Sequence, residues 1–524
     1  MARSTVLARG LAGLAVAASA AALAVAVAPA GAAPETSVAR VAWARCDTVE
    51  PFRRFDCATY PVPVDYADPD GPTVPLALIR RPADDPAAKI GTLFVNPGGP
   101  GTSGVSFVRS PGLGIATDAE TRRTFDIIGF DPRGVGASSP IGCFETLEEL
   151  TAALGPAKEV PIGATEIRDT LTAYRGYTDA CGRTAGPLLP HLSTLNVARD
   201  LDLLRQAVRD ERLTFAGYSY GTLIGATYAN LFPDRVRALV LDGFVDPAGR
   251  TQASVLNEFE RAGGFEETLK AFLAACNASG PGCAFSTGDP AAKFTALRER
   301  LRQGAALSGG RTISISYLTA YLASRLPQPA AYGAVATDLD TWYRDIVAPG
   351  ETAAAGDGAR SPAPATSRAA ALVDAYGGNS FDALNAVNCL DKQLPQEPWA
   401  YPALALSFET AYRTFGRLQA FSASVCATWP VTGERYDGPW DRPTPNPALV
   451  VGVQYDPATP YVFAERGTRQ LADARLLTVT GFGHTSLRAV SSCAREKVNS
   501  YLRTLAVPPE GTVCPTDSAP FQPA

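Results

Sequence analysis

Residues 213–232 read LTFAGYSYGTLIGATYANLF: a short apolar run, a Gly-Tyr-Ser-Tyr-Gly turn and a second apolar stretch. The run at 213–216 predicts a buried strand, and the stretch at 221–232 predicts a helix. Ser219 stands at the centre of a G-x-S-x-G pattern, where this strand would turn into this helix. Glycines beside it leave room for a sharply bent backbone, and a helix N-terminus favours negative charge nearby. The stretch therefore predicts a nucleophilic Ser219; a structural Gly-Ser turn is the alternative.

Short apolar runs recur along the chain, at residues 74–79, 91–95, 125–130, 238–241, 448–453 and 476–479. Several are apolar almost throughout, which is typical of strands that are covered on both faces. Helical stretches lie between them, so the sequence predicts an α/β protein with a mainly parallel central sheet. Between residues 247 and 446 the pattern turns mostly helical. We expect this part to form a large helical cap, inserted before the last two strands.

The N-terminal segment differs from the rest of the chain. Two arginines precede an uncharged, Ala-rich run that ends in a small-x-small site, which predicts an export signal. A transmembrane anchor is the alternative, because the run approaches the roughly 20 residues that span a bilayer. We expect a secreted mature protein without a stable membrane anchor. The predicted parts are a signal peptide at 1–32, the first part of the core at 33–246, the cap at 247–446 and the C-terminal part of the core at 447–524.

Composition sets limits on the class of protein. The 524 residues are 46% apolar, and 47 basic against 52 acidic side chains give a net charge of −5. The 47 glycines and 43 prolines indicate a globular, loop-rich chain rather than a low-complexity one. Binding of nucleic acid requires clustered Lys and Arg, which the sequence lacks, so no nucleic-acid partner is expected. The oligomeric state stays open.

The ten cysteines fit an exported chain, because an even number in an oxidising compartment favours disulfides. They fall into neighbouring couples, although the sequence alone permits many other pairings. The expected sequential pairs are Cys46–Cys57, Cys143–Cys181, Cys276–Cys283, Cys389–Cys426 and Cys493–Cys514. A zinc site is the competing use of cysteine. The chain has no C-x-x-C motif and only two histidines, so no metal is expected.

A serine nucleophile needs a base, and this chain offers only His191 and His484. His484 lies in a Gly-Phe-Gly-His-Thr turn after the last strand-like run, whereas His191 follows a proline in a polar segment. We therefore predict His484 as the base and a structural role for His191. Asp456 follows the run at 448–453 and precedes the histidine, as the acid of a triad should in this order. It would orient the imidazole and stabilise its protonated form; a solvated turn aspartate is the alternative.

A glycine-rich loop, Asn-Pro-Gly-Gly-Pro-Gly at residues 96–101, follows the predicted strand at 91–95. Backbone N–H groups can hold the negative oxygen that develops when a serine attacks a carbonyl. We predict such an oxyanion hole from the N–H groups of Gly98, Gly99 and Tyr220. A phosphate-binding loop is the alternative, but no G-K-[ST] follows and prolines interrupt the run of donors.

These motifs together resemble those of the exported tripeptidyl aminopeptidases of actinobacteria, which are α/β hydrolases grouped with the proline iminopeptidases. The matching stretches are NPGGPGTSG at 96–104, FDIIGFDPRGVGAS at 125–138, FAGYSYGTL at 215–223, FPDRVRALVLDGFVDP at 232–247 and the C-terminal part at 450–514. The resemblance covers most of residues 40–515, although the cap is matched only weakly. It implies an α/β-hydrolase fold, with Ser219, His484 and Asp456 as a catalytic triad and Arg133 as a structural brace.

By the same resemblance, the enzyme cleaves peptide bonds near the free N-terminus of oligopeptides by acyl transfer, without a cofactor. Relatives bind the substrate's ammonium group with acids of the cap, and Glu266 and Asp391 are the candidates here. Ordinary solvated carboxylates are the alternative for both residues. A carboxylesterase or lipase with the same triad is the second functional hypothesis, and a catalytically silent binding protein is the third.

Overall fold

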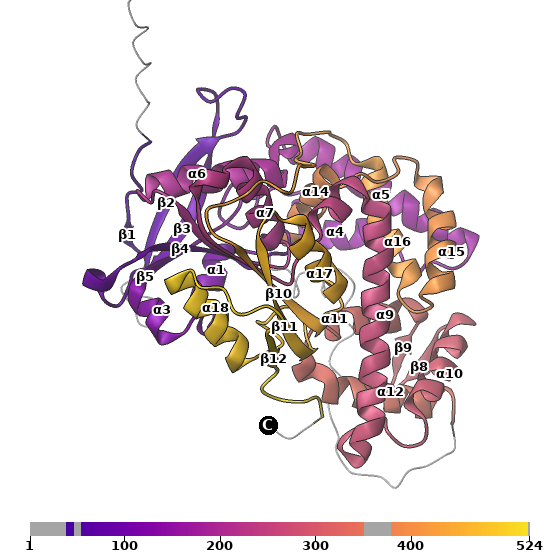
Figure 1. Cartoon of the computed structure of the whole chain (residues 1–524). Helices are drawn as coiled ribbons and strands as arrows, with labels where there is room; N and C mark the ends of the chain where they lie inside the picture. The colour runs from indigo at the N-terminus through magenta and orange to yellow at the C-terminus, as the bar shows by residue number, and fades with distance from the viewer. Residues whose placement is uncertain (1–37, 47–53, 350–378, 522–524) are drawn as a thin grey trace, which may run out of the picture. The chain divides into compact units, whose positions relative to one another are not determined.

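The computed structural model describes residues 38–46, 54–349 and 379–521, so the predicted signal peptide lies outside the described residues. A central sheet runs through this part of the chain in the strand order β1-β2-β3-β5-β4-β6-β7-β10-β11-β12 (Figure 1). Its strands are β1 (Ala44–Arg45), β2 (Asp56–Pro63), β3 (Thr73–Arg81), β4 (Gly91–Asn96), β5 (Phe125–Phe130), β6 (Leu213–Tyr218), β7 (Val236–Asp242), β10 (Ala448–Tyr455), β11 (Ala474–Phe482) and β12 (Val513–Pro515). The pairs β1–β2, β2–β3 and β3–β5 are antiparallel. Every later pair in this strand order, from β5–β4 to β11–β12, is parallel. The mainly parallel sheet is thus confirmed.

Helices cover the sheet, which explains why its central strands are apolar throughout. All residues of β5 and β6 are buried. One apolar cluster joins the sheet to α1, α2 and α18, while α7 packs along β6 and β7, and α17 along β10 and β11. No helix in the described ranges has the length and apolar character needed to cross a membrane. The helices of this part are α1 (Gly104–Arg109), α2 (Pro111–Ala116), α3 (Ala119–Thr124), α4 (Leu147–Leu154), α5 (Ala164–Thr184), α6 (Thr194–Ala207), α7 (Gly221–Leu231), α17 (Tyr461–Gln470) and α18 (Ser492–Thr504).

Three strands of the sheet, namely β1, β2 and β12, are absent from the sequence prediction, and β1 spans only two residues. Strand β2 contains Pro61 and Pro63, and proline ordinarily argues against a strand because it cannot donate a ladder hydrogen bond. Strand β12 spans only three residues and follows the last strand that the apolar pattern predicts. Its Cys514 is bonded to Cys493 at the start of α18, which holds this edge of the sheet in place.

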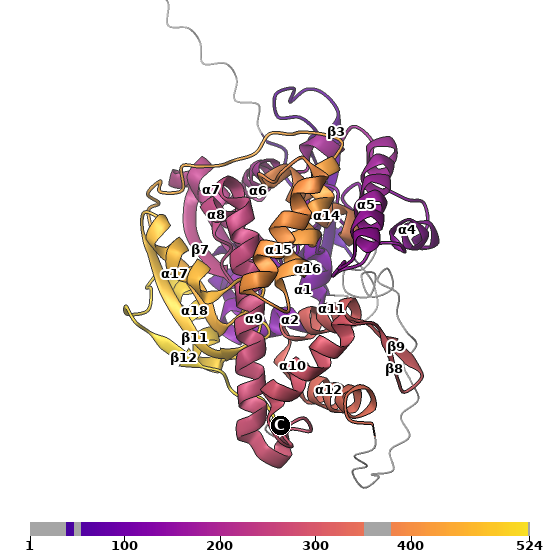
Figure 2. The same ribbon diagram turned by 90° about the vertical axis from the view of Figure 1, so that its right-hand side faces the viewer.

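Between β7 and β10, the described chain is mostly helical, as predicted for the cap. Figure 2 shows the long helix α9 beside α15 and α16. The cap has its own apolar cluster, which includes Phe272, Tyr332 and Trp342. Its elements are α8 (Pro247–Gln252), α9 (Ser254–Ser279), α10 (Pro290–Arg302), the hairpin of β8 (Ala306–Ser308) and β9 (Arg311–Ile313), α11 (Ile315–Arg325), α12 (Tyr332–Ile346), α14 (Ser380–Asp391), α15 (Tyr401–Ala411) and α16 (Gly416–Ala423). The boundaries at 246/247 and 446/447 stay predictions.

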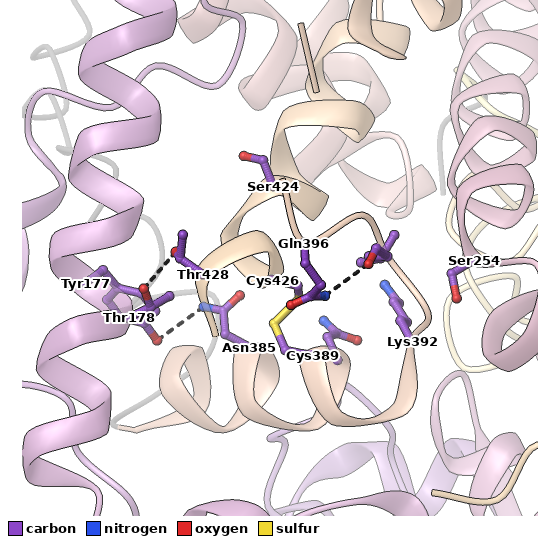
Figure 3. Close-up of a disulfide and its surroundings, with 12 residues drawn as sticks. Tyr177, Thr178, Ser254, Asn385, Cys389, Lys392, Gln396, Ser424, Cys426 and Thr428 are labelled. Atoms are coloured by element: carbon purple, nitrogen blue, oxygen red, sulfur yellow. Dashed lines mark hydrogen bonds between the residues drawn. A yellow bond between two sulfur atoms is a disulfide. The ribbon is translucent and has the colours of Figure 1, made fainter. Parts of the chain in front are cut away.

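The disulfides pair neighbours in sequence, as predicted. They are Cys46–Cys57, Cys143–Cys181, Cys276–Cys283, Cys389–Cys426 and Cys493–Cys514. The bond from Cys389 ties α14 to the 3₁₀ turn η8 (Ser424–Thr428), where the hydroxyls of Thr178 and Thr428 share a hydrogen bond of 2.9 Å (Figure 3). Helix α14 is therefore fastened to both η8 and, through it, α5.

Arg133 is the structural brace that the resemblance implies. Its guanidinium is fully buried and binds the Asp200 carboxylate through two hydrogen bonds of 2.6 and 2.8 Å. It also donates to the carbonyl oxygens of Pro63, Val64 and His191. The backbone of His191 thus takes part in this brace, in agreement with a structural role for that residue.

Candidate active site

Ser219 occupies the turn between β6 and α7 that the G-x-S-x-G pattern predicts. Its φ angle is +53°, a left-handed conformation that side-chain-bearing residues adopt only where the surroundings enforce it. Its N–H donates to the Asp242 carbonyl at 2.8 Å. A methyl group on Gly217 would lie 2.3 Å from the Gly221 carbonyl oxygen, and one on Gly221 would lie 2.6 Å from the Asn96 carbonyl oxygen. Both glycines are therefore required for the tight turn that carries the serine.

The glycine loop after β4 lies against this turn. A methyl group on Gly98 would lie 3.0 Å from both the Ser219 Cβ atom and the Tyr220 backbone nitrogen. The Gly98 N–H, however, donates to the side-chain oxygen of Asn96 at 2.9 Å. The N–H groups of Gly99 and Tyr220 have no acceptor among the described residues. Of the three predicted oxyanion donors, Gly98 is thus engaged by Asn96, and the roles of Gly99 and Tyr220 stay predictions.

The Asp456 carboxylate, which follows β10, binds the imidazole of His484, which follows β11. Nδ1 of His484 lies 2.9 Å from each carboxylate oxygen. The N–H groups of Ala458, Thr459 and Thr485 donate to the same carboxylate at 2.9, 2.9 and 3.1 Å, and the Thr459 hydroxyl donates at 2.9 Å. Because an ionised carboxylate only accepts, Nδ1 carries the proton and Nε2 is left free to accept one. The imidazole side chain is 21% exposed, whereas the Asp456 side chain is fully buried.

Asp242, at the end of β7, is a site residue that the sequence analysis missed. Strand β7 lies between the strand that leads to Ser219 and the strand that leads to Asp456. The Asp242 carboxylate accepts the Ser486 N–H at 3.0 Å and the Ser486 hydroxyl. Within the described chain, no hydrogen bond joins the Ser219 hydroxyl to His484, and Asp242 is the residue that contacts both of their loops. Such catalytic contacts are often long before substrate binds.

The cap reaches His484, the predicted base, directly. The His484 N–H donates to the carbonyl of Pro327, which follows α11, at 3.0 Å. The ring of Tyr332 packs edge-on against Phe482 with centroids 5.5 Å apart, and Tyr455 stacks on Phe482 at 4.7 Å. These contacts place the cap beside the predicted base and support the ends of β10 and β11.

The two predicted amine-binding acids are buried carboxylates of the cap. Glu266 accepts the Thr414 N–H at 3.0 Å and the Thr414 hydroxyl at 3.1 Å, which fastens α9 to the turn before α16. Asp391 accepts the Thr194 N–H at 2.9 Å and the Thr194 hydroxyl at 2.6 Å. Burial raises the pKa of Asp391. The Thr194 hydroxyl also lies 2.6 Å from the Tyr220 hydroxyl, so Asp391 is linked to the residue that follows Ser219.

One group of metal-ligand type occurs among the described residues, at Cys143, Cys181 and Asp382. The two sulfur atoms are bonded to each other, so neither is a thiolate. The carboxylate accepts the Cys143 N–H and the Tyr177 hydroxyl, each at 2.8 Å. These bonds account for the burial of Asp382 without an ion.

Comparison with known proteins gives the family. A family model described as "alpha/beta hydrolase fold" matches residues 91–271, and one described as "TAP-like protein" matches residues 412–514. Tripeptidyl aminopeptidase of Streptomyces coelicolor is 31% identical over 502 residues, which cover 93% of this chain and 88% of that protein. Serine protease Hip1 of Mycobacterium tuberculosis is 32% identical over 503 residues, which cover 90% of this chain and 91% of that protein. The chain belongs to the tripeptidyl aminopeptidase-like family of α/β hydrolases.

This family also contains a relative that is named for a different activity. Carboxylesterase B of Mycobacterium tuberculosis is 32% identical over 520 residues, which cover 96% of each chain. Membership of the tripeptidyl aminopeptidase-like family confirms the predicted fold and makes the protein a hydrolase. The two matched regions contain the four segments of the predicted site: the glycine loop and the serine turn lie in the first, and the aspartate turn and the histidine loop in the second.

Proposed function

We propose that this protein is an exported serine peptidase that removes a short peptide from the free N-terminus of oligopeptides. Ser219 is the nucleophile, His484 the base and Asp456 the acid that orients it. The observation that carries this proposal is the contact of His484 Nδ1 with both Asp456 oxygens at 2.9 Å. The likeness of the chain to a tripeptidyl aminopeptidase and to a serine protease supports peptide bonds as the target.

In the first step, the Ser219 oxygen attacks the scissile carbonyl carbon while His484 Nε2 takes the hydroxyl proton. The carbonyl oxygen becomes negative and is held by the N–H groups of Gly99 and Tyr220. His484 then gives its proton to the leaving nitrogen, and the C–N bond breaks to release the shortened peptide. Asp456 stabilises the protonated imidazole throughout.

In the second step, water cleaves the acyl-enzyme. His484 Nε2 accepts a proton from the water molecule as its oxygen attacks the ester carbon. The imidazole then returns this proton to the Ser219 oxygen, which leaves as a hydroxyl, and the N-terminal fragment departs as a carboxylic acid. Both steps use only side chains and backbone donors of this chain.

The position of the cap favours small or terminal substrates over folded proteins. Pro327 of the cap binds the backbone of His484 at 3.0 Å, so the base is confined between the sheet and the cap. A free ammonium group would require an acidic partner, and Glu266 and Asp391 remain our candidates. E266Q and D391N test them: loss of an ammonium ligand raises KM for a free peptide without affecting KM for an ester.

Export is part of the proposal. The predicted signal segment at 1–32 supports it, as do the disulfides, because such bonds persist in oxidising compartments. Analysis of the culture medium by N-terminal sequencing tests it. We expect a secreted chain that begins after Ala32, and a protein retained in the cell with an intact N-terminus would contradict export.

Substrate profiling tests the peptidase function. Tripeptide anilides with a free and an acetylated N-terminus would be compared with p-nitrophenyl esters, and the products of a mixed peptide library would be weighed by mass spectrometry. We expect blocking of the amine to lower kcat/KM at least 100-fold and the released fragments to be tripeptides. Equal turnover of free and blocked peptides would contradict an N-terminal exopeptidase.

A carboxylesterase is the second candidate, and the 32% identity to Carboxylesterase B over 96% of the chain favours it. The same triad and oxyanion donors serve ester cleavage, which needs no ligand for an amine. Turnover of the esters without turnover of any free tripeptide anilide would select this function. Absence of both activities, together with absence of labelling by a fluorophosphonate, would select a catalytically silent binding protein.

A further inference from the structure

Asp242 lies where the two catalytic loops meet. Its backbone carbonyl accepts the Ser219 N–H at 2.8 Å. Its carboxylate accepts the N–H of Ser486, two residues beyond His484, at 3.0 Å and also accepts the Ser486 hydroxyl. One residue thus fastens the nucleophile turn through its backbone and the histidine loop through its side chain.

The carboxylate of Asp242 is also a second negative charge beside the base. The titratable groups that face it are Tyr218 from β6, Asp456 from the turn after β10 and His484 from the loop after β11. Asp242 is only 1% exposed, and no Lys or Arg forms an ion pair with it in the described parts of the chain. Burial raises the pKa of Asp242 to about 6, while the bonds from Ser486 act against this rise.

A buried carboxylate without a cationic partner is costly to stability. When it is ionised, however, it supplies a negative charge that an apolar residue or an amide does not. The imidazole of His484 becomes positive during each acyl-transfer step, and a nearby fixed negative charge then stabilises it. Asp456 contacts the imidazole directly, whereas Asp242 contacts the His484 loop through Ser486.

We propose that Asp242 is a positioning residue of the active site: its carboxylate holds the His484 loop beside Ser219 through Ser486, and its charge stabilises the protonated imidazole. The proposal rests on the proposed roles of Ser219 and His484. It assigns Asp242 no contact with substrate and no proton transfer.

Two variants separate the tether from the charge. In D242N, the side-chain oxygen can still accept the Ser486 N–H and the new NH₂ group can donate to the Ser486 hydroxyl, so only the charge is lost. In S486A, the charge remains and the hydroxyl tether is lost. D210N is the matched control, because Asp210 is another carboxylate whose pKa is raised by burial, and it accepts the Thr92 N–H at 2.8 Å near the opposite end of β4.

The readouts are kcat and KM from pH 5 to pH 9 on the best anilide or ester, together with the Tm. For D242N we expect the acid side of the kcat/KM profile to move to lower pH by roughly 0.5–1 unit, with kcat about 3–10-fold lower and KM within about twofold. Folding raises the pKa of the Asp242 carboxyl, so the ionised form of this group destabilises the folded protein at a pH above that pKa. The Tm of D242N at pH 7.5 should therefore equal or exceed that of the wild type. S486A should lower kcat at least threefold without moving the pH profile, and D210N should change neither.

A D242N profile that coincides with the wild-type profile, at unchanged kcat, would overturn the charge role. Wild-type kcat in S486A would overturn the tether, and this variant decides the positioning role if D242N fails to fold. Failure of the proposed function gives a different result, namely full activity of S219A or H484A. The two failures are therefore distinguishable.

Discussion

Replacement of Asp456 by asparagine tests the acid of the triad. Five donors converge on its two carboxylate oxygens: His484 Nδ1, the N–H groups of Ala458, Thr459 and Thr485, and the Thr459 hydroxyl. Asparagine offers one oxygen and one NH₂ group, so it cannot accept all five. The backbone donors are fixed by the turn, whereas the imidazole can change tautomer. The NH₂ group then forces the proton of His484 onto Nε2, where it blocks proton transfer from serine.

The wrong tautomer costs about 10⁴-fold in kcat in a well-studied serine protease triad. At about 1.4 kcal/mol per factor of ten, this is about 5.5 kcal/mol of transition-state stabilisation. The assay is steady-state kinetics of D456N on the best ester or anilide, with the Tm as a folding check. We expect KM to change less than threefold, because the Asp456 side chain is fully buried.

D246N is the control for D456N. Asp246 is another buried carboxylate, and it caps α8 by accepting the Gly249 N–H at 2.9 Å. We expect D246N to keep kcat within about twofold of the wild type, with a lower Tm. A folded D456N enzyme with more than about a tenth of the wild-type kcat would refute the assignment, because another group would then be orienting His484.

Three further predictions follow from other contacts. G98A places a methyl group 2.4 Å from a backbone oxygen of the serine turn, so kcat should fall about 10²–10³-fold; a kcat within threefold of the wild type would contradict the placement of the glycine loop. Loss of the disulfide between Cys389 and Cys426, which are 37 residues apart, should lower the free energy of unfolding by about 3–4 kcal/mol, as measured by chemical denaturation. Amide hydrogens of α14 should then exchange faster than those of the central sheet, and equal acceleration in α14 and in the sheet would contradict this prediction. Burial alone would raise the pKa of Glu258, but the ion pair with Lys392 lowers this pKa to about 2. The ionised Glu258 carboxylate therefore stabilises the fold above pH 4.5, and this stabilisation is lost as the pH falls towards 2. E258Q should flatten the fall in unfolding free energy between pH 4.5 and 2, and an unchanged slope would refute the reasoning.

The turns that carry the candidate site residues could be predicted from the sequence because each turn is marked locally. The turn around Ser219 has its own glycine pattern, and the turns of Asp456 and His484 follow apolar runs that become β10 and β11. Side chains at the carboxyl ends of parallel strands share one edge of a sheet. Once the strands are identified, the location of these residues at one edge of the sheet therefore follows from the fold.

Contacts between distant side chains were out of reach of the sequence. Asp242 and Ser486 are 244 residues apart, and the only local sign was a polar residue at the end of an apolar run. Glu266 binds Thr414 across 148 residues, so its burial could not be told from a solvated helix carboxylate. The Gly98 N–H, by contrast, donates to the side-chain oxygen of Asn96 only two residues earlier, which is a local Asx turn that the sequence analysis overlooked.

The central claim is that His484 makes Ser219 nucleophilic. A fluorophosphonate reacts with such a serine, and mass spectrometry of the digested protein locates the adduct. We predict one adduct, on the peptide that contains Ser219, with no adduct and about 10⁶-fold lower turnover in S219A and much slower labelling in H484A. An adduct on a different residue, or S219A turnover above a few per cent of the wild type, would contradict the account.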